Sequence, residues 1–448
     1  MDDTLKELNT LERTFAGFEK PSNLKLSLLK IITDNFSDEL KIGEGGCGKV
    51  YKGILRNGII AVKRLFNSHT IDDRMFHQEV QSLTMAKHKN TVRFLGYCSH
   101  TEGQAIDLDG KIILAEIRER LLCFEYLGNG SLEDHITDEL RGLEWQTRYQ
   151  IIQGICEGLH HLHKEKGIIH MDLKPANILL DENMVPKITD FGLSRLDEKS
   201  QTLSENRFLS LRYCAPEYQI HGRMSAKSDI YSLGVIIREL VTGSREEPST
   251  TKVLRRWKHR WNKSVKDKQS GYKEVAKCLD LAQRCMHTDP TYRPHIWNII
   301  GDLQEMRSVD AHNSYTTECL ELEDMLGIEP LDEMNLPFKL NRQLSCSIEL
   351  TNDTGRYFAF RILTTSLWPY YIVPAEDIVP PRSKLTVNIT LQATKNAPLQ
   401  NQYKDEFTVQ STTVDGNLKT MDINGEMFDE NPGKVVDKVN FMIVLDAS

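Results

Sequence analysis

The chain has 448 residues and a hydrophobic content of 40%, so it is long enough for two or three domains with packed cores. Its net charge of −8 argues against broad nucleic-acid binding, and no apolar run approaches the roughly 18 residues needed to span a bilayer. Nine cysteines without a CxxC pair, and a first segment without an apolar signal, predict a protein of the reducing cytoplasm that reaches a membrane only through a partner.

The first motif in the chain is a glycine-rich segment between two strand-like runs. Residues 42–50 read I-G-E-G-G-C-G-K-V, with glycines at positions 43, 45 and 48 and a valine at position 50. Glycine is needed where the backbone closes over phosphate groups, because a Cβ atom would intervene. A lone pattern of this kind more often marks a turn, so its meaning depends on the elements that follow.

A lysine at the end of the next hairpin and a carboxylate on the next helix extend this motif. The turn signal R-N-G at 56–58 returns the chain into an apolar strand that ends at Lys63. A lysine at a strand end is usually only solvated, but at this distance from a glycine loop it is predicted to bind the α- and β-phosphates. Glu79 lies in the predicted helix 72–85, and its carboxylate is predicted to hold Lys63 in place.

Two strings further along supply the groups that phosphoryl transfer needs. Residues 169–177 read I-H-M-D-L-K-P-A-N and provide a carboxylate, an ammonium group and an amide at Asp172, Lys174 and Asn177. A second carboxylate follows at Asp190, in the string D-F-G. Transfer of a phosphoryl group requires a base for the hydroxyl proton, a cation near the γ-phosphate and oxygen ligands for Mg²⁺. The two strings, in this order, predict that chemistry.

With these five motifs in order, residues 25–305 resemble a protein kinase of the plant receptor-like class. The strings N-F-S at 35–37, Y-K-G at 51–53 and A-P-E-Y at 215–218 are typical of that class. The K-P pair at 174–175 is typical of Ser/Thr kinases. The resemblance implies an α+β bilobal kinase fold that binds ATP and Mg²⁺ and phosphorylates protein substrates.

The resemblance also implies a role for each motif residue. It assigns catalysis to Asp172 and Lys174 and metal binding to Asn177 and Asp190. The backbone of residues 121–127 would bind adenine, as the hinge between the lobes. The nucleotide site, with Phe124 as the gatekeeper, would comprise Gly43, Gly45, Gly48, Val50, Ala61, Lys63, Glu79, Phe124, Glu125 and Leu127.

Beyond the site, the resemblance implies supporting contacts in the large lobe. Glu217 and Arg293 would form a structural ion pair, and Asp229 would anchor the catalytic loop. The string H-H-L-H at 160–163 is predicted to form a helix end beside that loop.

One departure from the family pattern lies next to the catalytic base. Met171 stands where an arginine usually precedes the aspartate. That arginine pairs with a phosphate on the activation segment, and methionine cannot do so. The chain therefore resembles the non-RD subgroup of kinases, which is often linked to immune signalling.

Two further departures affect the activation segment and the small lobe. Leu209 and Arg212 replace two glycines at a tight bend, where a Cβ costs about 1 kcal/mol or more if φ is positive. Ser210 keeps the hydroxyl expected to contact the catalytic loop. Residues 99–118 lengthen a connection between two small-lobe strands, and we expect a surface loop there, with a docking role as the less favoured alternative.

Residues 253–268 combine an apolar stripe with basic residues. Leu254, Trp257, Trp261 and Val265 recur at helical spacing, and five lysines and arginines surround them. One interpretation is a basic amphipathic helix for a membrane or for calmodulin. The favoured interpretation is a large-lobe helix that packs its tryptophans and has a solvated basic face, because the segment lies inside the kinase span.

Near residue 310 helical periodicity gives way to short alternating runs separated by turn signals. The runs are 345–350, 357–363, 384–391, 406–411 and 435–445. Strands of this kind predict a small β-sandwich. Three strings resemble the major sperm protein (MSP) domain, as in the VAP family that docks partners at the endoplasmic reticulum: C-S-I-E-L-T-N at 346–352, I-V-P-P at 378–381 and F-T-V-Q-S at 407–411. The resemblance implies an all-β, immunoglobulin-like sandwich that binds a peptide or membrane-protein partner.

The peptide site of VAP-type domains is basic and binds acidic peptides that contain phenylalanine. Thr364-Thr365 matches part of that site, but Glu406 stands where the family has a lysine, and Val373 stands where an arginine usually precedes the proline. A carboxylate in place of an ammonium group inverts the attraction, at a cost of about 1–3 kcal/mol. A structural role or a different partner is therefore at least as well supported as peptide docking.

The sequence thus predicts an N-terminal segment 1–24, a kinase domain 25–305, a linker 306–325 and an MSP-like sandwich 326–448. The predicted function is that of an ATP- and Mg²⁺-dependent Ser/Thr protein kinase in cytoplasmic signalling or defence. The alternative is a weakly active or inactive kinase that acts as a scaffold through its C-terminal domain. The retained charged motif residues favour the enzyme, and the altered activation segment favours the scaffold.

Overall fold

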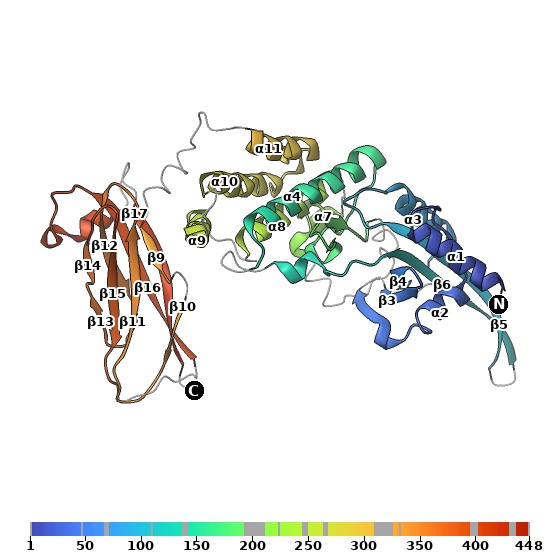
Figure 1. The fold of residues 1–448 in the computed structure, drawn as a ribbon, viewed down its shortest axis with the longest axis horizontal. Coiled ribbons are helices and arrows are strands. Elements are labelled where there is room, and N and C mark those ends of the chain that lie inside the picture. The colour runs from blue at the N-terminus through green and yellow to red at the C-terminus, as the bar shows by residue number, and fades with distance from the viewer. Residues whose placement is uncertain are drawn as a thin grey trace. The chain divides into compact units, whose positions relative to one another are not determined.

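The computed structural model divides the chain into two compact units, one of residues 1–246 and 277–310 and the other of residues 247–276 and 311–448. Each unit has a hydrophobic core of its own. Figure 1 shows the helices and strands of both. The structure describes residues 2–45, 48–66, 71–108, 111–136, 142–191, 211–222, 225–243, 250–262, 268–308, 326–330, 333–394, 402–429 and 436–446.

The first unit begins with a sheet whose strand order is β1-β5-β6-β4-β3-β2 (Figure 1). Its strands are β1 (Ser22–Asn23), β2 (Lys41–Gly45), β3 (Gly48–Leu55), β4 (Gly58–Leu65), β5 (Phe94–Leu108) and β6 (Lys111–Glu125). The helical elements of this region are α1 (Asp2–Phe15), α2 (Leu26–Ile32), the short 3-10 helix η1 (Asp38–Leu40) and α3 (Asp73–Met85). The helix predicted at 72–85 is confirmed as α3, and Asp72 is its N-cap.

The two faces of this sheet have different roles because side chains alternate along each strand. Ile60 and Val62 point to one face and are fully buried in a core shared with Leu11 of α1 and Leu28 of α2. Ala61 and Lys63 alternate with them on β4 and therefore point to the opposite face. The helices α1 and α2 thus cover one face and leave the other available for the predicted nucleotide site.

Residues 99–108 and 111–118 lie in two paired antiparallel strands, so the prediction of a surface loop was wrong for these residues. The strands β5 and β6 continue in antiparallel register as far as the pair Leu108↔Lys111. The sequence has Asp109-Gly110 between them, a dipeptide that favours two-residue hairpin turns, although these two residues lie outside the described part. The apolar run Ile112–Leu114 and this turn signal could have revealed the hairpin.

The rest of the first unit is mainly helical (Figure 1). Its longer elements are α4 (Trp145–His160), α7 (Pro216–His221), α8 (Ala226–Thr242), α10 (Lys268–Cys285, of which residues from 277 belong to this unit) and α11 (Ile296–Ser308). The two-stranded sheet is β7 (Ile178–Leu180) and β8 (Pro186–Ile188). Short helices are η2 (Leu132–His135), the π-helix η3 (His161–Lys166), η4 (Pro175–Asn177), η5 (Leu211–Tyr213) and η6 (Pro290–Tyr292).

The basic, tryptophan-containing segment forms the helix α9 (Thr250–Asn262). Leu254, Trp257 and Trp261 are all buried, and the two tryptophan rings lie 5.2 Å apart. Trp261 also contacts the ring of Tyr272 at 4.8 Å. The prediction that the helix packs its tryptophans is confirmed for these residues, while Val265 lies outside the described part of the chain. The other two parts of that interpretation were wrong: α9 belongs to the second unit and not to the first, and Arg255 of the predicted solvated basic face is buried and paired with Asp437.

The second unit contains the predicted β-sandwich. One sheet has the order β10-β17-β16-β12-β14 and the other has the order β13-β15-β11-β9. The strands are β9 (Gly327–Glu329), β10 (Glu333–Pro337), β11 (Leu344–Asn352), β12 (Tyr357–Thr364), β13 (Tyr370–Val373), β14 (Glu376–Val379), β15 (Ser383–Leu391), β16 (Gln402–Val414) and β17 (Val436–Asp446). Two short 3-10 helices follow β16, η7 (Thr420–Asp422) and η8 (Gly425–Phe428).

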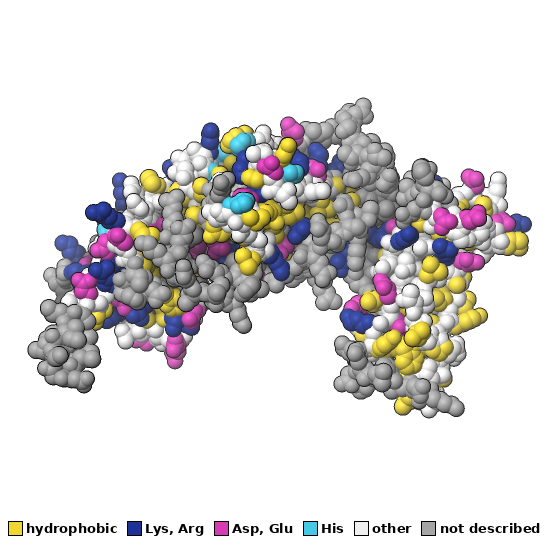
Figure 2. Space-filling model, turned by 180° about the vertical axis from the view of Figure 1, so that it is seen from behind, with side chains coloured by type: hydrophobic (Ala, Val, Ile, Leu, Met, Phe, Trp, Pro, Cys, Tyr) yellow, Lys and Arg dark blue, Asp and Glu magenta, His cyan; other side chains and the backbone are white. Residues whose placement is uncertain are grey.

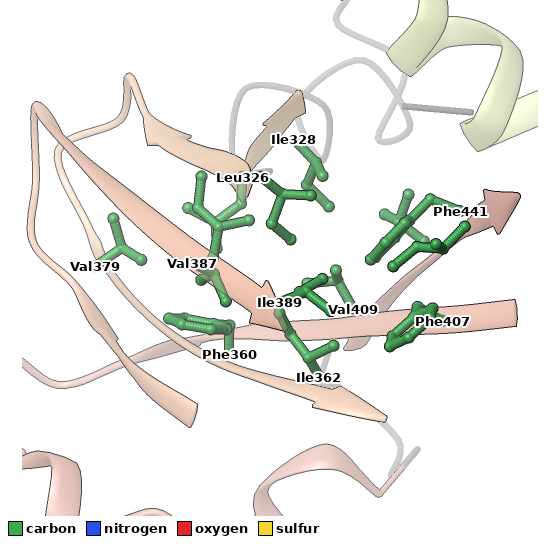
Figure 3. Close-up of a cluster of buried hydrophobic side chains, with 14 of the residues drawn as sticks. Leu326, Ile328, Phe360, Ile362, Val379, Val387, Ile389, Phe407, Val409 and Phe441 are labelled. Atoms are coloured by element: carbon green, nitrogen blue, oxygen red, sulfur yellow. The ribbon is translucent and has the colours of Figure 1, made fainter. Parts of the chain in front are cut away.

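The core of the sandwich lies between its two sheets (Figure 3). Phe360 and Phe407 from one sheet and Val387 and Ile389 from the other are fully buried. The rings of Phe407 and Phe441 stack at 5.3 Å. All five predicted strands are confirmed, and each is within a few residues of its expected bounds.

Candidate active site

Lys63 and Asp190 meet in the first unit although 127 positions separate them in the chain. The Lys63 Nζ atom lies 2.7 Å from Asp190 Oδ2, and the lysine side chain is only 8% exposed. Burial raises the pKa of Asp190, but the charge and hydrogen bond of Lys63 outweigh this, so the pKa lies below its ordinary value. Asp190 is therefore a carboxylate at neutral pH, the form that binds a cation.

The catalytic loop brings its three predicted residues together. Lys174 Nζ lies 2.8 Å from Asp172 Oδ2, and the amide nitrogen of Asn177 donates to the same carboxylate at 3.1 Å. The Asn177 amide also donates to the backbone oxygen of Asp172 at 2.8 Å. Asp172 remains 41% exposed, so its carboxylate can reach a hydroxyl group from solvent. This geometry suits a base next to a cation.

Asp229 holds the catalytic loop by its backbone, as the sequence predicted. The Asp229 carboxylate is 1% exposed and accepts hydrogen bonds from the backbone nitrogens of His170 at 2.7 Å and Met171 at 2.9 Å. Met171 has a φ of 71°, which costs about 1 kcal/mol or more in a residue other than glycine. The two hydrogen bonds to a buried carboxylate maintain this strained conformation.

Asn177 and Asp190 lie at one end of the small sheet formed by β7 and β8. These strands are antiparallel, with Ile178 opposite Ile188, so the residue before β7 is beside the residues after β8. The backbone nitrogen of Thr189 donates to the backbone oxygen of Asn177 at 3.0 Å. An amide oxygen and a carboxylate are ligands that Mg²⁺ accepts in proteins. The donor set therefore fits the predicted metal.

The predicted nucleotide residues share one face of the small-lobe sheet. The register places Val50 opposite Lys63 and Ala61 opposite Phe124, and directly opposite side chains point to the same face. Lys63 and Ala61 are two residues apart on β4, so all four side chains lie on that face. This is the face that α1 and α2 leave uncovered.

The glycines of the loop have different surroundings. A Cβ at Gly43 or Gly45 would meet no atom within 4 Å, so the space beside these two residues is open. A Cβ at Gly48 would instead collide with the backbone oxygen of Arg64 on β4. Gly46 and Cys47 lie outside the described residues.

Glu79 is buried on α3, with 4% of its surface exposed. The ion pair described above joins Lys63 to Asp190, so the predicted contact between Lys63 and Glu79 stays a prediction. At the hinge, Glu125 ends β6 and Leu127 follows it, and both are half-buried. The backbone nitrogen of Glu125 donates to the backbone oxygen of Arg93 at 3.0 Å.

The ion pair predicted between Glu217 and Arg293 is confirmed. Both of its N–O distances are 2.7 Å, and the Arg293 side chain is fully buried. Burial raises the pKa of Glu217, but the hydrogen bonds of Arg293 outweigh this and the pKa lies below its ordinary value. The pair therefore joins α7 to the region after η6 at neutral pH.

The altered activation segment is described only from residue 211. Arg212 is not among the residues with positive φ, so the strain expected from a Cβ there is absent. Its side chain lies 3.7 Å from the buried carboxylate of Glu239, which also accepts a hydrogen bond from the hydroxyl of Tyr213 at 2.7 Å. Leu209 and Ser210, the other residues discussed for this bend, lie outside the described part.

In the MSP-like sandwich, Glu406 and Thr364 lie side by side. The Thr364 hydroxyl donates to the backbone oxygen of Glu406 at 2.8 Å, and the exposed carboxylate accepts a hydrogen bond from Asn440 at 2.7 Å. Exposed hydrophobic residues nearby in the chain include Leu367, which is 97% exposed, and Tyr371. Figure 2 shows hydrophobic side chains gathered on one face of this unit.

Comparison with known families identifies the class of protein. The model of the protein kinase domain matches residues 36–302, more than half of the chain, and the chain belongs to this family. The model of the MSP (Major sperm protein) domain matches residues 325–432, so the sandwich is an MSP domain.

The curated relatives place the kinase region among receptor-like kinases of plants. Cysteine-rich receptor-like protein kinase 29 of Arabidopsis thaliana is 38% identical over 290 residues, which are 59% of this chain and 40% of the relative. A G-type lectin S-receptor-like serine/threonine-protein kinase of the same plant is 38% identical over 295 residues, 62% of this chain and 33% of the relative. The chain thus spans well under half the length of these two relatives. Within its described residues no helix is long and apolar enough to cross a membrane.

Residues 160–163 were expected to form a helix end beside the catalytic loop, and α4 does end at His160, but several contacts that support the site were not predicted from the sequence. His163 Nε2 lies 2.7 Å from the Asp229 carboxylate, and His170 Nε2 lies 2.9 Å from the backbone oxygen of Thr189. Lys187 lies 3.2 Å from the Glu125 carboxylate. These are contacts between segments far apart in the chain, and nothing local in the sequence indicates them.

Proposed function

We propose that the protein is an ATP- and Mg²⁺-dependent serine/threonine protein kinase. The observation that carries the proposal is the convergence of Lys63, Asp190 and the catalytic loop in one unit of the chain. Phosphoryl transfer needs a base, cations near the phosphates and oxygen ligands for a metal, and this arrangement supplies all three.

Each group has a defined task in the proposed reaction. The Ser or Thr hydroxyl of the protein substrate donates its proton to Asp172 as its oxygen attacks the γ-phosphorus, and ADP leaves with the electrons of the broken bond. Lys174 lies beside Asp172 and balances the charge that develops on the transferred group. Asn177 and Asp190 are the residues that would hold Mg²⁺, which would supply positive charge against the phosphate oxygens.

The nucleotide would bind on the face that carries Val50, Ala61, Lys63 and Phe124. The glycines at 43, 45 and 48 would cover its phosphates, and the backbone from Glu125 to Leu127 would bind its adenine ring. Support comes from the strand register, which gives these side chains a common face. Glu79 would complete the site by orienting Lys63 from α3.

A test of the enzyme proposal uses the purified chain, radiolabelled ATP, Mg²⁺ and a general acceptor protein. The chain should incorporate label into itself or the acceptor, and Asp190→Asn should abolish incorporation because the metal loses a charged ligand. Equal background labelling by both proteins would instead support the rival proposal of an inactive scaffold. The absence of strain at Arg212 favours the enzyme over that rival.

We further propose that the chain consists of an N-terminal segment 1–24, a kinase domain 25–305, a linker 306–325 and an MSP domain 326–448. We also propose that the kinase is of the non-RD type and acts in signalling or defence. Met171 supports that type. A cytoplasmic location is supported by the cysteines of the described part, which are all free thiols. The MSP domain would bind a peptide or membrane-protein partner, for which the exposed Glu406 is an unfavourable residue if the peptide is acidic.

A further inference from the structure

The helix α1 lies outside the stretch that matches the kinase family, yet it belongs to the core of the small lobe. Leu11 is fully buried, and Leu8 and Phe15 pack beside it against the same hydrophobic cluster. The helix contacts α2 and β5, beside the sheet (Figure 1). It is therefore an addition to the kinase fold that is held by burial of apolar surface.

One polar anchor of α1 is at the turn between β3 and β4. Glu12 accepts hydrogen bonds from the backbone nitrogen of Arg56 at 3.0 Å and from its guanidinium group at 2.9 Å. The backbone oxygen of Glu12 accepts a third from the Asn57 side chain at 3.0 Å. The Arg56 hydrogen bonds keep the pKa of Glu12 below its ordinary value. A Cβ at Gly58 would approach the ring of Phe15 to 2.5 Å, so glycine is needed for this contact.

A second polar anchor is at the carboxyl end of α1. The Arg93 guanidinium donates to the backbone oxygen of Phe15, the last residue of the helix, at 2.7 Å. The same guanidinium lies 5.6 Å from the centre of the Phe15 ring. A cation at the carboxyl end of a helix interacts favourably with the helix dipole, and a cation over an aromatic ring adds to this.

Arg93 also contacts the hinge. Its backbone nitrogen donates to the Glu125 carboxylate at 2.9 Å, and its backbone oxygen accepts from the Glu125 nitrogen at 3.0 Å. The Arg93 side chain lies 4.0 Å from the same carboxylate, and Lys187 lies 3.2 Å from it on another side. The backbone of Arg93 therefore holds Glu125, while its side chain binds the end of α1 and lies within 4.0 Å of Glu125.

We propose that Arg93 is a positioning residue that links α1 to the hinge, so that docking of α1 sets how tightly the adenine nucleotide binds. This inference depends on the proposed function, because it takes residues 125–127 as the adenine-binding segment. The hinge position then depends on a helix outside the matched kinase region. Loosening that helix changes nucleotide affinity while the phosphoryl-transfer groups keep their geometry.

The test measures ADP binding by calorimetry, and KM for ATP and kcat with an acceptor protein, for the full chain and its variants. Arg93→Met keeps an unbranched apolar stem and both backbone contacts, but it removes the link to Phe15 together with the 4.0 Å contact to the Glu125 carboxylate. We expect it to raise the ADP dissociation constant and KM for ATP about three- to tenfold, with kcat changed less than about twofold. Arg93→Lys, which keeps a cation, should restore part of the affinity.

Glu12→Gln provides an independent variant, because it weakens the other anchor of α1 and leaves Arg93 and Glu125 intact. It should weaken ADP binding in the same direction by a smaller factor. Arg13→Met is the matched control, since Arg13 lies on α1, is 61% exposed and pairs only with Glu19 in the contacts described. Its nucleotide binding should equal that of the wild type.

Two results would overturn the inference. In the first, Arg93→Met and Glu12→Gln lower the melting temperature but leave ADP binding and KM unchanged, which means that α1 only stabilises the lobe. In the second, Arg93→Met weakens ADP binding while Glu12→Gln has no effect, which means that Arg93 acts on the hinge directly and that the docking of α1 has no influence on nucleotide affinity. If the wild type itself binds no ADP, the proposed function fails, and this outcome is distinct from both.

Discussion

The two candidate binding regions of the molecule hold their charged groups in different ways. In the kinase unit, Lys63 is buried and paired with Asp190, and Asp172 is paired with both Lys174 and Asn177. In the MSP domain, the residue that departs from the family pattern, Glu406, is exposed and has its carboxylate bound by Asn440.

This difference affects what a substitution does to folding in each region. A buried ionic group cannot be replaced alone, because its partner would remain as an unpaired charge in a poorly solvated place, at a cost of about 3–5 kcal/mol. An exposed carboxylate at the surface of a strand can replace a lysine with little effect on folding. The replacement instead changes the affinity of that surface for its ligand.

The largest effect should come from the buried pair. Lys63→Met should lower turnover about 100- to 1000-fold, because the ammonium group that orients the phosphates is lost. Phosphate incorporation per minute is the measurement, and Lys89→Met is the control, since Lys89 is 66% exposed and pairs with Glu157 at the surface. Wild-type turnover by Lys63→Met would show that Lys63 on β4 does not bind the phosphates of the nucleotide.

The next largest effect should be the loss of folding stability after a substitution in the core of the MSP domain. An isolated piece of residues 326–448 should unfold in one cooperative transition, because the sandwich has its own buried core. Phe360→Ala should lower its free energy of unfolding by about 3–5 kcal/mol, since a fully buried ring leaves a cavity. Urea denaturation of both proteins gives the difference. A loss below about 1 kcal/mol would show that the site collapses around the missing ring.

The exposed carboxylate should affect binding without affecting folding. Glu406→Lys should strengthen binding of an acidic, Phe-containing peptide about 5- to 100-fold and make it more sensitive to salt. Calorimetry at two ionic strengths measures both effects. Glu349→Lys carries the same change in net charge on the other sheet, where Glu349 pairs with Lys384, and should leave binding unchanged. Tight binding by the wild type, unaffected by Glu406→Lys, would place the peptide site elsewhere.

The smallest effect should follow dephosphorylation. The methionine at position 171 cannot bind a phosphate, so phosphatase treatment should change the specific activity less than about threefold. Activity before and after treatment is the measurement. A drop of about a hundredfold would show that another cation of the large lobe takes the place of the missing arginine.

The sequence predicted those parts of the fold that depend on local patterns. The order of the glycine loop, Lys63, the catalytic loop and Asp190 indicated the kinase fold, and alternation indicated five strands of the sandwich. The short strands β9, β10, β13 and β14 were missed because three to five residues carry too little pattern.

Contacts between distant segments were the other part that sequence reasoning missed. The pairing of His163 with Asp229 and of Arg93 with Phe15 depends on the folded arrangement. The sequence of α1 does indicate a helix, because Leu5, Leu8 and Leu11 recur at three-residue spacing. The segment was nevertheless predicted only as a stretch before the kinase domain.

The anchoring of the catalytic loop by Asp229 has a consequence for how such proteins diverge. Asp229 binds the backbone amides of residues 170 and 171 and not the side chain at position 171. Every amino acid except proline supplies that amide, so a mutation at position 171 can alter how the protein is switched on while the shape of the loop is inherited unchanged. Control and chemistry can therefore evolve separately at adjacent residues.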